Sequence, residues 1–117
     1  MVQAPLLECS FLIPIRRDAK LSDGAAHERW LWTWLDAELY RRFGGGTQSE
    51  ALYQGYYIDP DTNEKVSDQC LKFFVALLED QVNELRQLLQ GVCFLFQQKC
   101  IYLNVGGRVE FVKQSDE

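Results

Sequence analysis

The chain has few of the side chains that usually build metal centres. Among its 117 residues there is one histidine, His27, and the four cysteines are scattered without a C-x-x-C pair. A structural zinc site needs several such ligands at short, regular spacings. We therefore expect no metal site and no cofactor. Free cysteine behaves as a small hydrophobic residue, so reduced and buried thiols are predicted at Cys9, Cys70, Cys93 and Cys100.

Long apolar runs and an excess of positive charge are also missing. No stretch approaches the run of about 18 apolar residues that a membrane span requires, and residues 1–12 lack the features of a signal peptide. With 17 acidic against 12 basic residues, the net charge of -5 disfavours contact with nucleic acid or anionic lipid. The aromatic segment that marks an RNA-binding sheet is absent too. A cytoplasmic protein without nucleic-acid or membrane partners is expected.

What is present fits one compact domain. Hydrophobic residues make up 47% of the chain and charged residues 25%, as in ordinary globular proteins. A chain of this length buries roughly two-thirds of its unfolded surface, enough for a single core. We expect one α+β domain over residues 1–117, with a polar C-terminal tail from about residue 113.

The clearest pattern is a wide apolar stripe at helical spacing between Glu79 and Phe96. It contains Val82, Leu85, Leu88, Leu89, Val92, Cys93 and Phe96. Asp80 is the candidate N-cap. A helix with so wide a stripe must lie on a sheet or on other helices.

A second helix is predicted from the caps at residues 22–24 to about Phe43. Its expected inner stripe is His27, Trp30, Leu31, Trp34, Leu35, Leu39 and Phe43. Trp32 and Tyr40 fall outside this stripe, so we expect them to contact a second subunit or a later segment of the chain. The glycines at 44–46 end the helix, and because they do not open one, a phosphate loop is disfavoured.

Alternating or apolar runs predict the strands. They are residues 6–15, ending near Pro14, then 50–59, 70–78, 100–105 and 108–112. Two hairpins result, one around residues 59–63 and one around Gly106 and Gly107. The Asp59, Asp61 and Asn63 spacing imitates a calcium loop, but the required glycine and glutamate are missing, so a turn is favoured.

This order gives the β-α-β-β-α-β pattern of a ferredoxin-like two-layer sandwich, followed by a C-terminal strand. Its antiparallel sheet would carry both helices on one face. The helix-free face would present strand tyrosines, and an exposed apolar face of that size usually marks an interface. We therefore predict a homodimer, or a pocket between two sheets.

Candidate ligand-binding residues are His27, Thr47, Tyr53, Tyr56 and Tyr57. Glu8 and Asp59 are further candidates for acid–base chemistry. A histidine at a helix start is expected to be neutral and able to act as a base, although a packing role is the favoured interpretation. The tyrosines suit strands and cores as well as pockets. The basic pair Arg16 and Arg17 suits an anion, but a solvated loop is favoured.

Several segments together resemble a group of short bacterial proteins of unknown function. They are Glu8–Asp18, Phe43–Gly45 with Thr47, Gly55–Asp59, Ser67–Asp68, Gln98–Leu103 and Val109–Phe111. The resemblance covers nearly the whole chain. It implies a small bacterial cytoplasmic protein, and it implies no activity or catalytic residue.

Two functions from different classes remain open at this point. The favoured one is a non-enzymatic interaction or regulatory module that self-associates through its aromatic surfaces. Such a module could also bind a different protein as its partner. The alternative is a small enzyme or small-molecule binder with a pocket between sheet and partner subunit, in which His27 and a strand tyrosine supply polar groups.

Overall fold

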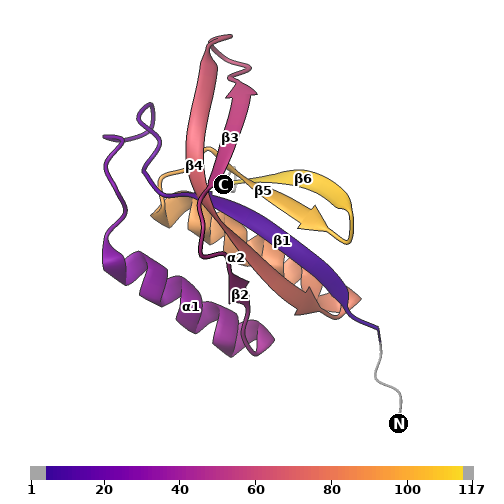
Figure 1. Ribbon diagram of the computed structural model, residues 1–117. Coiled ribbons are helices and arrows are strands. Elements are labelled where there is room, and N and C mark those ends of the chain that lie inside the picture. Colours follow the sequence, from indigo (N-terminus) through magenta and orange to yellow (C-terminus); the bar gives the residue numbers. More distant parts are fainter. Residues whose placement is uncertain (1–4, 115–117) are drawn as a thin grey trace.

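The computed structural model describes residues 5–114. It contains one six-stranded sheet and two α-helices that cover the same face of the sheet (Figure 1). The elements in chain order are β1 (Leu7–Pro14), α1 (Arg29–Phe43), β2 (Thr47–Gln48), β3 (Tyr53–Ile58), β4 (Lys65–Leu77), the 3-10 turn η1 (Glu79–Gln81), α2 (Val82–Leu95), β5 (Cys100–Val105) and β6 (Arg108–Lys113). The predicted α+β two-layer sandwich is confirmed.

The sheet is antiparallel throughout, and its order is β2-β4-β1-β5-β6, with β3 also paired to β4. One feature goes beyond the predicted pattern, because the short strand β2, which was not predicted, pairs with the second half of β4. The predicted C-terminal strand is present as β6, and it extends the sheet beyond β5.

Strand β4 is longer than expected, because it begins at Lys65 rather than Cys70. Its polar first half pairs with β3 from Cys70 back to Lys65, around the predicted turn at Asp59. This hairpin projects beyond the helices (Figure 1), and we call residues 53–70 the arm. Most of its side chains are exposed, since no helix covers it.

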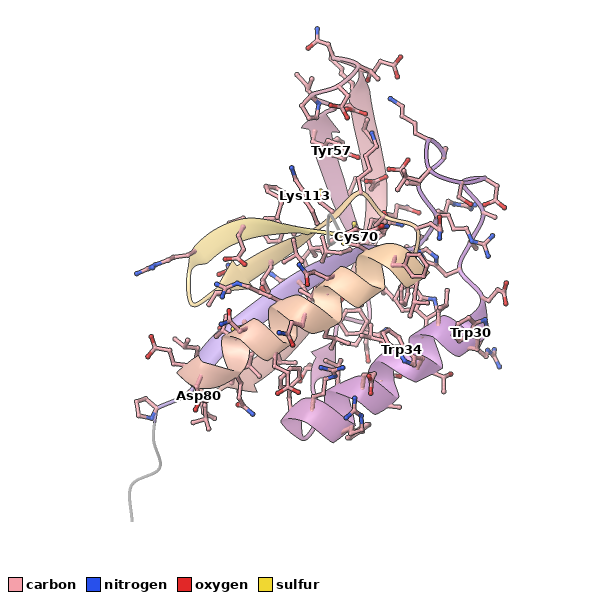
Figure 2. All side chains as sticks on the ribbon, turned by 180° about the vertical axis from the view of Figure 1, so that it is seen from behind. Trp30, Trp34, Tyr57, Cys70, Asp80 and Lys113 are labelled. Atoms are coloured by element: carbon pink, nitrogen blue, oxygen red, sulfur yellow. The ribbon has the colours of Figure 1, made fainter. Side chains whose placement is uncertain are left out.

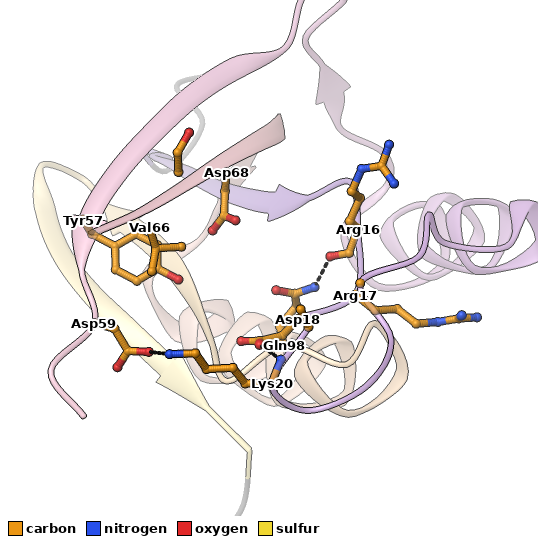
Figure 3. Close-up of a pocket in the computed structure, with 12 residues that line it drawn as sticks. Arg16, Arg17, Asp18, Lys20, Tyr57, Asp59, Val66, Asp68 and Gln98 are labelled. Atoms are coloured by element: carbon orange, nitrogen blue, oxygen red, sulfur yellow. Dashed lines mark hydrogen bonds and ion pairs between the residues drawn. The ribbon is translucent and has the colours of Figure 1, made fainter. Parts of the chain in front are cut away.

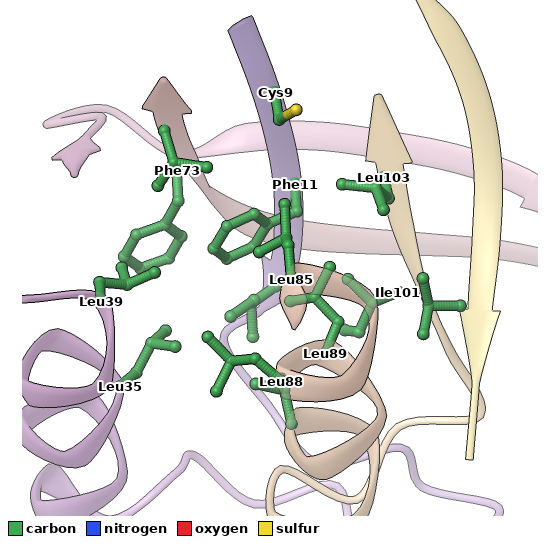
Figure 4. Close-up of a cluster of buried hydrophobic side chains, with 14 of the residues drawn as sticks. Cys9, Phe11, Leu35, Leu39, Phe73, Leu85, Leu88, Leu89, Ile101 and Leu103 are labelled. Atoms are coloured by element: carbon green, nitrogen blue, oxygen red, sulfur yellow. The ribbon is translucent and has the colours of Figure 1, made fainter. Parts of the chain in front are cut away.

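Side chains from the sheet and from both helices form one core (Figure 4). On β1 the alternate residues Cys9, Phe11 and Ile13 are fully buried, as the period of a one-sided strand requires. Phe11 stacks on Phe73 of β4 with ring centroids 5.2 Å apart. Helix α2 buries the predicted stripe from Val82 to Cys93.

The start of α2 differs in detail from the prediction. The helix proper begins at Val82 after the turn η1, and Asp80 makes no cap hydrogen bond. Instead the Leu78 backbone N–H donates to Oε1 of Gln81 at 2.8 Å. Gln81 therefore satisfies a backbone donor at the helix entrance, and the N-cap role expected of Asp80 is wrong.

Helix α1 begins at Arg29, later than predicted, and this changes which tryptophan is inside. Its buried residues are Leu31, Leu35 and Leu39. Trp30, expected on the inner stripe, is 54% exposed. Trp32, expected outside, packs against the core and lies edge-on to Phe96 with ring centroids 5.0 Å apart. Of the two contacts expected for Trp32, the structure has the one with later segments of the same chain, although the side chain faces inward rather than outward. Tyr40 is 72% exposed as expected.

The turn between β5 and β6 is the predicted two-residue hairpin turn. Gly106 and Gly107 both have positive φ angles, 56° and 101°, as a two-residue hairpin turn requires. Of the polar tail, residues 115–117 lie outside the described residues. No helix among the described residues is long and apolar enough to cross a membrane.

All four thiols are unpaired, with Cys9, Cys70 and Cys93 buried and Cys100 partly buried. Burial raises the pKa of Cys70 to about 11 and that of Cys93 to about 12. These two thiols therefore stay protonated at neutral pH and serve as core residues.

Replacing the fully buried Leu89 by alanine tests the weight of the α2 stripe. Leu89→Ala leaves a cavity between α2 and the sheet, so the free energy of unfolding should fall by about 2–5 kcal/mol. Phe94→Ala is the matched control on the same helix, because Phe94 is 62% exposed. It should change stability by less than about 0.5 kcal/mol in urea denaturation. Equal losses in both variants would contradict this core assignment.

Candidate functional site

A cavity of about 290 Å³ lies between the arm and the loop that follows β1 (Figure 3). It is lined by Arg16, Arg17, Asp18, Ala19, Lys20, Gly24, Tyr57, Asp59, Val66, Ser67, Asp68 and Gln98. Three segments that are distant in the sequence therefore meet here: the loop at 16–24, the arm, and the turn after α2. Most of the polar lining residues carry a charge.

The loop that forms one wall of the cavity is held by hydrogen bonds to the turn after α2. Gln98 is buried, and its Nε2 donates to the Arg16 carbonyl oxygen at 2.7 Å. The Asp18 backbone N–H donates to the Gln97 carbonyl oxygen at 2.9 Å. Because both bonds anchor backbone rather than side chains, residues 16–18 have a defined position without any ligand.

An ionic bridge ties this loop to the tip of the arm. Nζ of Lys20 donates to Oδ2 of Asp59 at 3.1 Å and to Oγ1 of Thr62 at 3.0 Å. Lys99 adds a second cation 3.5 Å from the same Asp59 oxygen. The Asp59 side chain is only 7% exposed, so these partners have little competition from water.

The Asp59 carboxylate is ionised at neutral pH. A hydrogen bond from the Asp61 backbone N–H to Oδ1 of Asp59, 2.8 Å long, is the largest cause, and Lys20 is the next. Together they lower the pKa of Asp59 to about 2. Asp59 therefore acts as a structural anion that closes one end of the cavity, rather than as a proton acceptor.

Tyr57 and Asp68 point into the cavity from β3 and β4 (Figure 3). Burial, followed by the nearby carboxylates of Asp68 and Asp18, raises the pKa of Tyr57 to about 12. Burial is also the largest cause that raises the pKa of Asp68, and Asp18 adds to it. At neutral pH Tyr57 is a hydroxyl donor, while Asp68 is a carboxylate that gains from any cation placed beside it.

Gly55 keeps space open beside Asp68. It is the cross-strand partner of Asp68 in the β3–β4 ladder. A Cβ built on Gly55 would have only the Asp68 carbonyl oxygen, at 3.7 Å, within contact range. Because the residue of β3 that pairs with Asp68 is a glycine, it has no side chain that could cover Asp68.

A second cavity, of about 270 Å³, adjoins the first. Its lining residues are Pro14, Ile15, Arg16, Gln54, Ser67, Asp68 and Gln69. Arg16, Ser67 and Asp68 line both cavities. The side chain of Gln54 is held in place because its Nε2 donates to Oγ of Ser67 at 2.6 Å.

The structure does not bring the sequence-predicted ligand residues together. Tyr57 lines the first cavity, and so does Asp59, whereas His27, Thr47, Tyr53 and Tyr56 line neither cavity. Thr47 lies on the edge strand β2, where it pairs with Phe74 of β4. Tyr56 is 78% exposed. The ring of Tyr53 lies 5.3 Å from Nζ of Lys72.

His27 has a packing role below the loop. Its Nε2 lies 2.8 Å from the Pro14 carbonyl oxygen, and its ring is edge-on to Phe96 at 4.9 Å. Burial is the main cause that lowers the pKa of His27, so it is neutral as predicted. The positive end of a helix was the expected cause, but His27 precedes α1 and does not lie in its first turn, so burial is the cause instead.

Sequence reasoning missed Asp68, Lys20 and Gln98. Residues 16–20 were interpreted as a solvated loop, yet they form a cavity wall. Asp68 lay outside the predicted strand, because the polar first half of β4 does not resemble a buried strand. Aspartate is depleted in strands. Its presence in a hairpin strand is therefore the signal that could have identified Asp68 as a functional residue.

The arrangement suits a ligand that has both a cationic part and a hydrogen-bonding part. Asp68 supplies an anion, Tyr57 supplies a ring and a hydroxyl donor, and Arg16 supplies a cation. Neither cavity is lined by histidine or cysteine. Among residues 5–114 no group of three or more His, Cys, Asp or Glu side chains is placed to hold a metal ion.

No protein-family model and no curated protein sequence matches the chain. Solved structures of similar fold include a phage SAM lyase in complex with S-methyl-5'-thioadenosine. That match has a TM-score of 0.72 and 11% identity, and it covers 100% of this chain and 96% of the other. A phage SAM lyase in the apo state matches with a TM-score of 0.58 and 10% identity, over 95% of this chain and 90% of the other. The likeness at this identity is one of fold.

The depressed pKa of Asp59 leads to a prediction about acid stability. Because its folded-state pKa of about 2 lies below the ordinary value of 3.8, the ionised carboxylate stabilises the fold above pH 4. This contribution is lost as the pH falls through 2. The stability difference between wild type and Asp59→Asn should therefore be largest near neutral pH and should shrink between pH 4 and pH 2, as measured by urea denaturation.

Asp61→Asn is the control for this experiment, since the Asp61 side chain is 75% exposed and its one ion pair among residues 5–114 is with Lys99, at 3.5 Å. It should leave the pH profile close to that of the wild type. A pH-independent difference between wild type and Asp59→Asn would show that the ionic bridge does not depend on this carboxylate.

Proposed function

We propose that this chain is a small enzyme that binds SAM in the cavity at the base of the arm and releases S-methyl-5'-thioadenosine. The observation that carries the proposal is the position of Asp68 and Tyr57 inside a cavity of a fold shared, over the whole chain, with a phage SAM lyase. This favours the enzyme or ligand-binder hypothesis over the non-enzymatic module. The pocket, however, contains Tyr57 and not His27.

The charges of the site fit a sulfonium substrate. SAM carries a positive sulfur, an ammonium group and a carboxylate, and its net charge at neutral pH is positive. A chain with a net charge of -5 attracts such a cation. The partly desolvated carboxylate of Asp68 gains more from a neighbouring sulfonium than an exposed carboxylate would. Asp68 is therefore assigned to the sulfonium end of the substrate.

Tyr57 is suited to the nucleoside part. Tyr57 is 48% exposed, which leaves part of the residue accessible for a purine to stack upon its ring. Its hydroxyl remains protonated because its pKa is about 12, so it donates a hydrogen bond. Val66, its cross-strand partner, adds an apolar contact beside it.

The bond that breaks follows from the product. S-methyl-5'-thioadenosine retains the methyl and adenosyl groups on sulfur, so cleavage separates sulfur from the aminobutyrate chain. The electron pair of that bond stays on sulfur and leaves a neutral thioether. The carbon chain balances its charge either by giving up a proton, which leaves an unsaturated amino acid, or by bonding to its own carboxylate, which closes a lactone. These two products are isomers of equal mass, so proton NMR of the second product distinguishes the two courses.

Finer predictions from the sequence belong to the same proposal. A ferredoxin-like order of the core strands is supported by β4 next to β1 and β1 next to β5, with β6 added at the edge. A bacterial, cytoplasmic setting is consistent with a substrate found in cells generally. Self-association through the helix-free face of the sheet is supported by Val109 and Phe111, which are 49% and 60% exposed on β6.

Asp68→Asn tests the proposed activity. Incubation of the wild-type protein with SAM should yield S-methyl-5'-thioadenosine, detected by liquid chromatography and mass spectrometry. Loss of the charge at Asp68 should lower kcat/KM by at least about tenfold, the cost of a charge-assisted contact. Wild-type activity should also decrease as the pH falls through the raised pKa of Asp68, because the protonated carboxyl no longer attracts a cation.

Stability separates this effect from unfolding. Because burial disfavours the ionised form of Asp68, Asp68→Asn should have an unchanged or higher Tm. Asp36→Asn, an exposed change on α1, is the control and should keep full activity. Neither product formation nor binding of S-methyl-5'-thioadenosine by the wild-type protein would overturn the proposal.

Phe111→Asp tests the proposed self-association. A charge at the centre of an apolar contact should weaken association at least about tenfold, so the mass in light scattering should fall toward that of one chain. Phe94→Asp is the matched control, since Phe94 is similarly exposed but lies on α2, on the opposite layer. A monomeric wild-type protein at micromolar concentration would refute self-association.

A further inference from the structure

We propose that the second cavity is the subsite for the aminocarboxylate end of the substrate and that Arg16 binds the carboxylate there. This inference rests on the proposed function and extends it to a residue that decides specificity. The two cavities share Arg16, Ser67 and Asp68, so one elongated ligand can pass from the first cavity to the second beside Asp68.

Size favours a ligand that occupies both cavities. The volumes of about 290 Å³ and 270 Å³ each lie at or below the lower end of small-molecule sites. A nucleoside thioether suits the first cavity, which has the ring of Tyr57. The aminobutyrate chain of the substrate then needs space beyond the sulfur, and the second cavity supplies it.

The lining of the second cavity is suited to a polar group. Apart from Pro14 and Ile15, every lining residue can hydrogen-bond or carries a charge. The amides of Gln54 and Gln69 offer acceptors for an ammonium group. The first cavity, in contrast, has Val66 and Ala19 as well as Tyr57 among its lining residues.

Arg16 is the cation whose charge is available in this site. The neighbouring Arg17 pairs with Asp23 at 3.2 Å and with Glu28 at 3.4 Å, and Lys20 pairs with Asp59. Within residues 5–114 the Arg16 guanidinium has no carboxylate partner and makes no side-chain hydrogen bond. Figure 3 shows this side chain extended away from Lys20 and Asp59. A free guanidinium on a polar cavity wall is well suited to bind a carboxylate in a bidentate manner.

The backbone of Arg16 is held firmly enough to place that guanidinium. Gln98 binds its carbonyl oxygen, and Arg16 forms an isolated β-bridge with Ala26. The Ile15 backbone N–H donates to the Gln69 carbonyl oxygen at 2.9 Å, which ties the same segment to β4. Arg16 and Asp68 therefore have fixed relative backbone positions on opposite walls of the junction.

Two stable ligands separate the subsites in a calorimetric experiment. S-adenosylhomocysteine carries the aminocarboxylate end but no sulfonium, so it is not a substrate for cleavage at a charged sulfur. S-methyl-5'-thioadenosine lacks that end. For Arg16→Gln, the Kd of S-adenosylhomocysteine should rise about tenfold or more, while the Kd of S-methyl-5'-thioadenosine stays unchanged.

Two further variants control for charge and folding. Arg16→Lys keeps the charge but not the bidentate geometry, so it should recover part of the lost affinity. Arg108→Gln removes an exposed arginine from the distant β5–β6 hairpin and should change neither Kd. Circular dichroism of Arg16→Gln should match that of the wild type.

The outcomes distinguish this inference from the proposed function. If the wild type binds neither ligand, both fail. If it binds S-methyl-5'-thioadenosine and Arg16→Gln weakens both ligands equally, the proposed function stands and the subsite is refuted. A Kd of S-adenosylhomocysteine that Arg16→Gln leaves unchanged would refute the subsite as well.

Discussion

Strand β4 must satisfy its backbone hydrogen bonds along its whole length, although the helices cover only its second half. From Cys70 to Leu77 it pairs with β1, and β2 adds a short pairing at Phe73 and Phe74, whereas from Lys65 to Asp68 its strand partner is β3. The hairpin therefore leaves the body of the molecule as a projecting arm (Figure 2). The space between this arm and the loop after β1 is the cavity on which the proposed chemistry depends.

Two kinds of interaction keep that space defined. Neutral hydrogen bonds from the turn after α2 hold the loop backbone, and the pairing of Lys20 and Lys99 with Asp59 holds the tip of the arm. The first kind is insensitive to pH, while the second depends on an ionised carboxylate. The cavity therefore lies between a loop held by neutral hydrogen bonds and an arm tip held by an ionic contact.

The charges within the cavity are unevenly satisfied. Asp59 and Arg17 have partners, whereas Asp68 is held in surroundings that disfavour its ionised form and Arg16 projects without a partner among the described residues. The partly buried charge of Asp68 costs stability in the free protein, and in the proposed function both groups bind a ligand group of opposite charge. They would hold a substrate that has a cation near its middle and a carboxylate at one end.

Local patterns in the sequence determined the main elements. The stripe from Val82 to Cys93 and the alternation from Cys9 to Ile13 report helical and strand periods directly, and the two-layer α+β class follows from their order. The orientation of Trp32 and the early start of β4 were decided by tertiary packing, since one depends on where α1 begins and the other on pairing with β3. The site was decided by tertiary structure alone. Arg16, Asp68 and Gln98 carry no common spacing, and they meet only because the sheet brings the end of β1 beside the middle of β4 while α2 returns the chain beneath them.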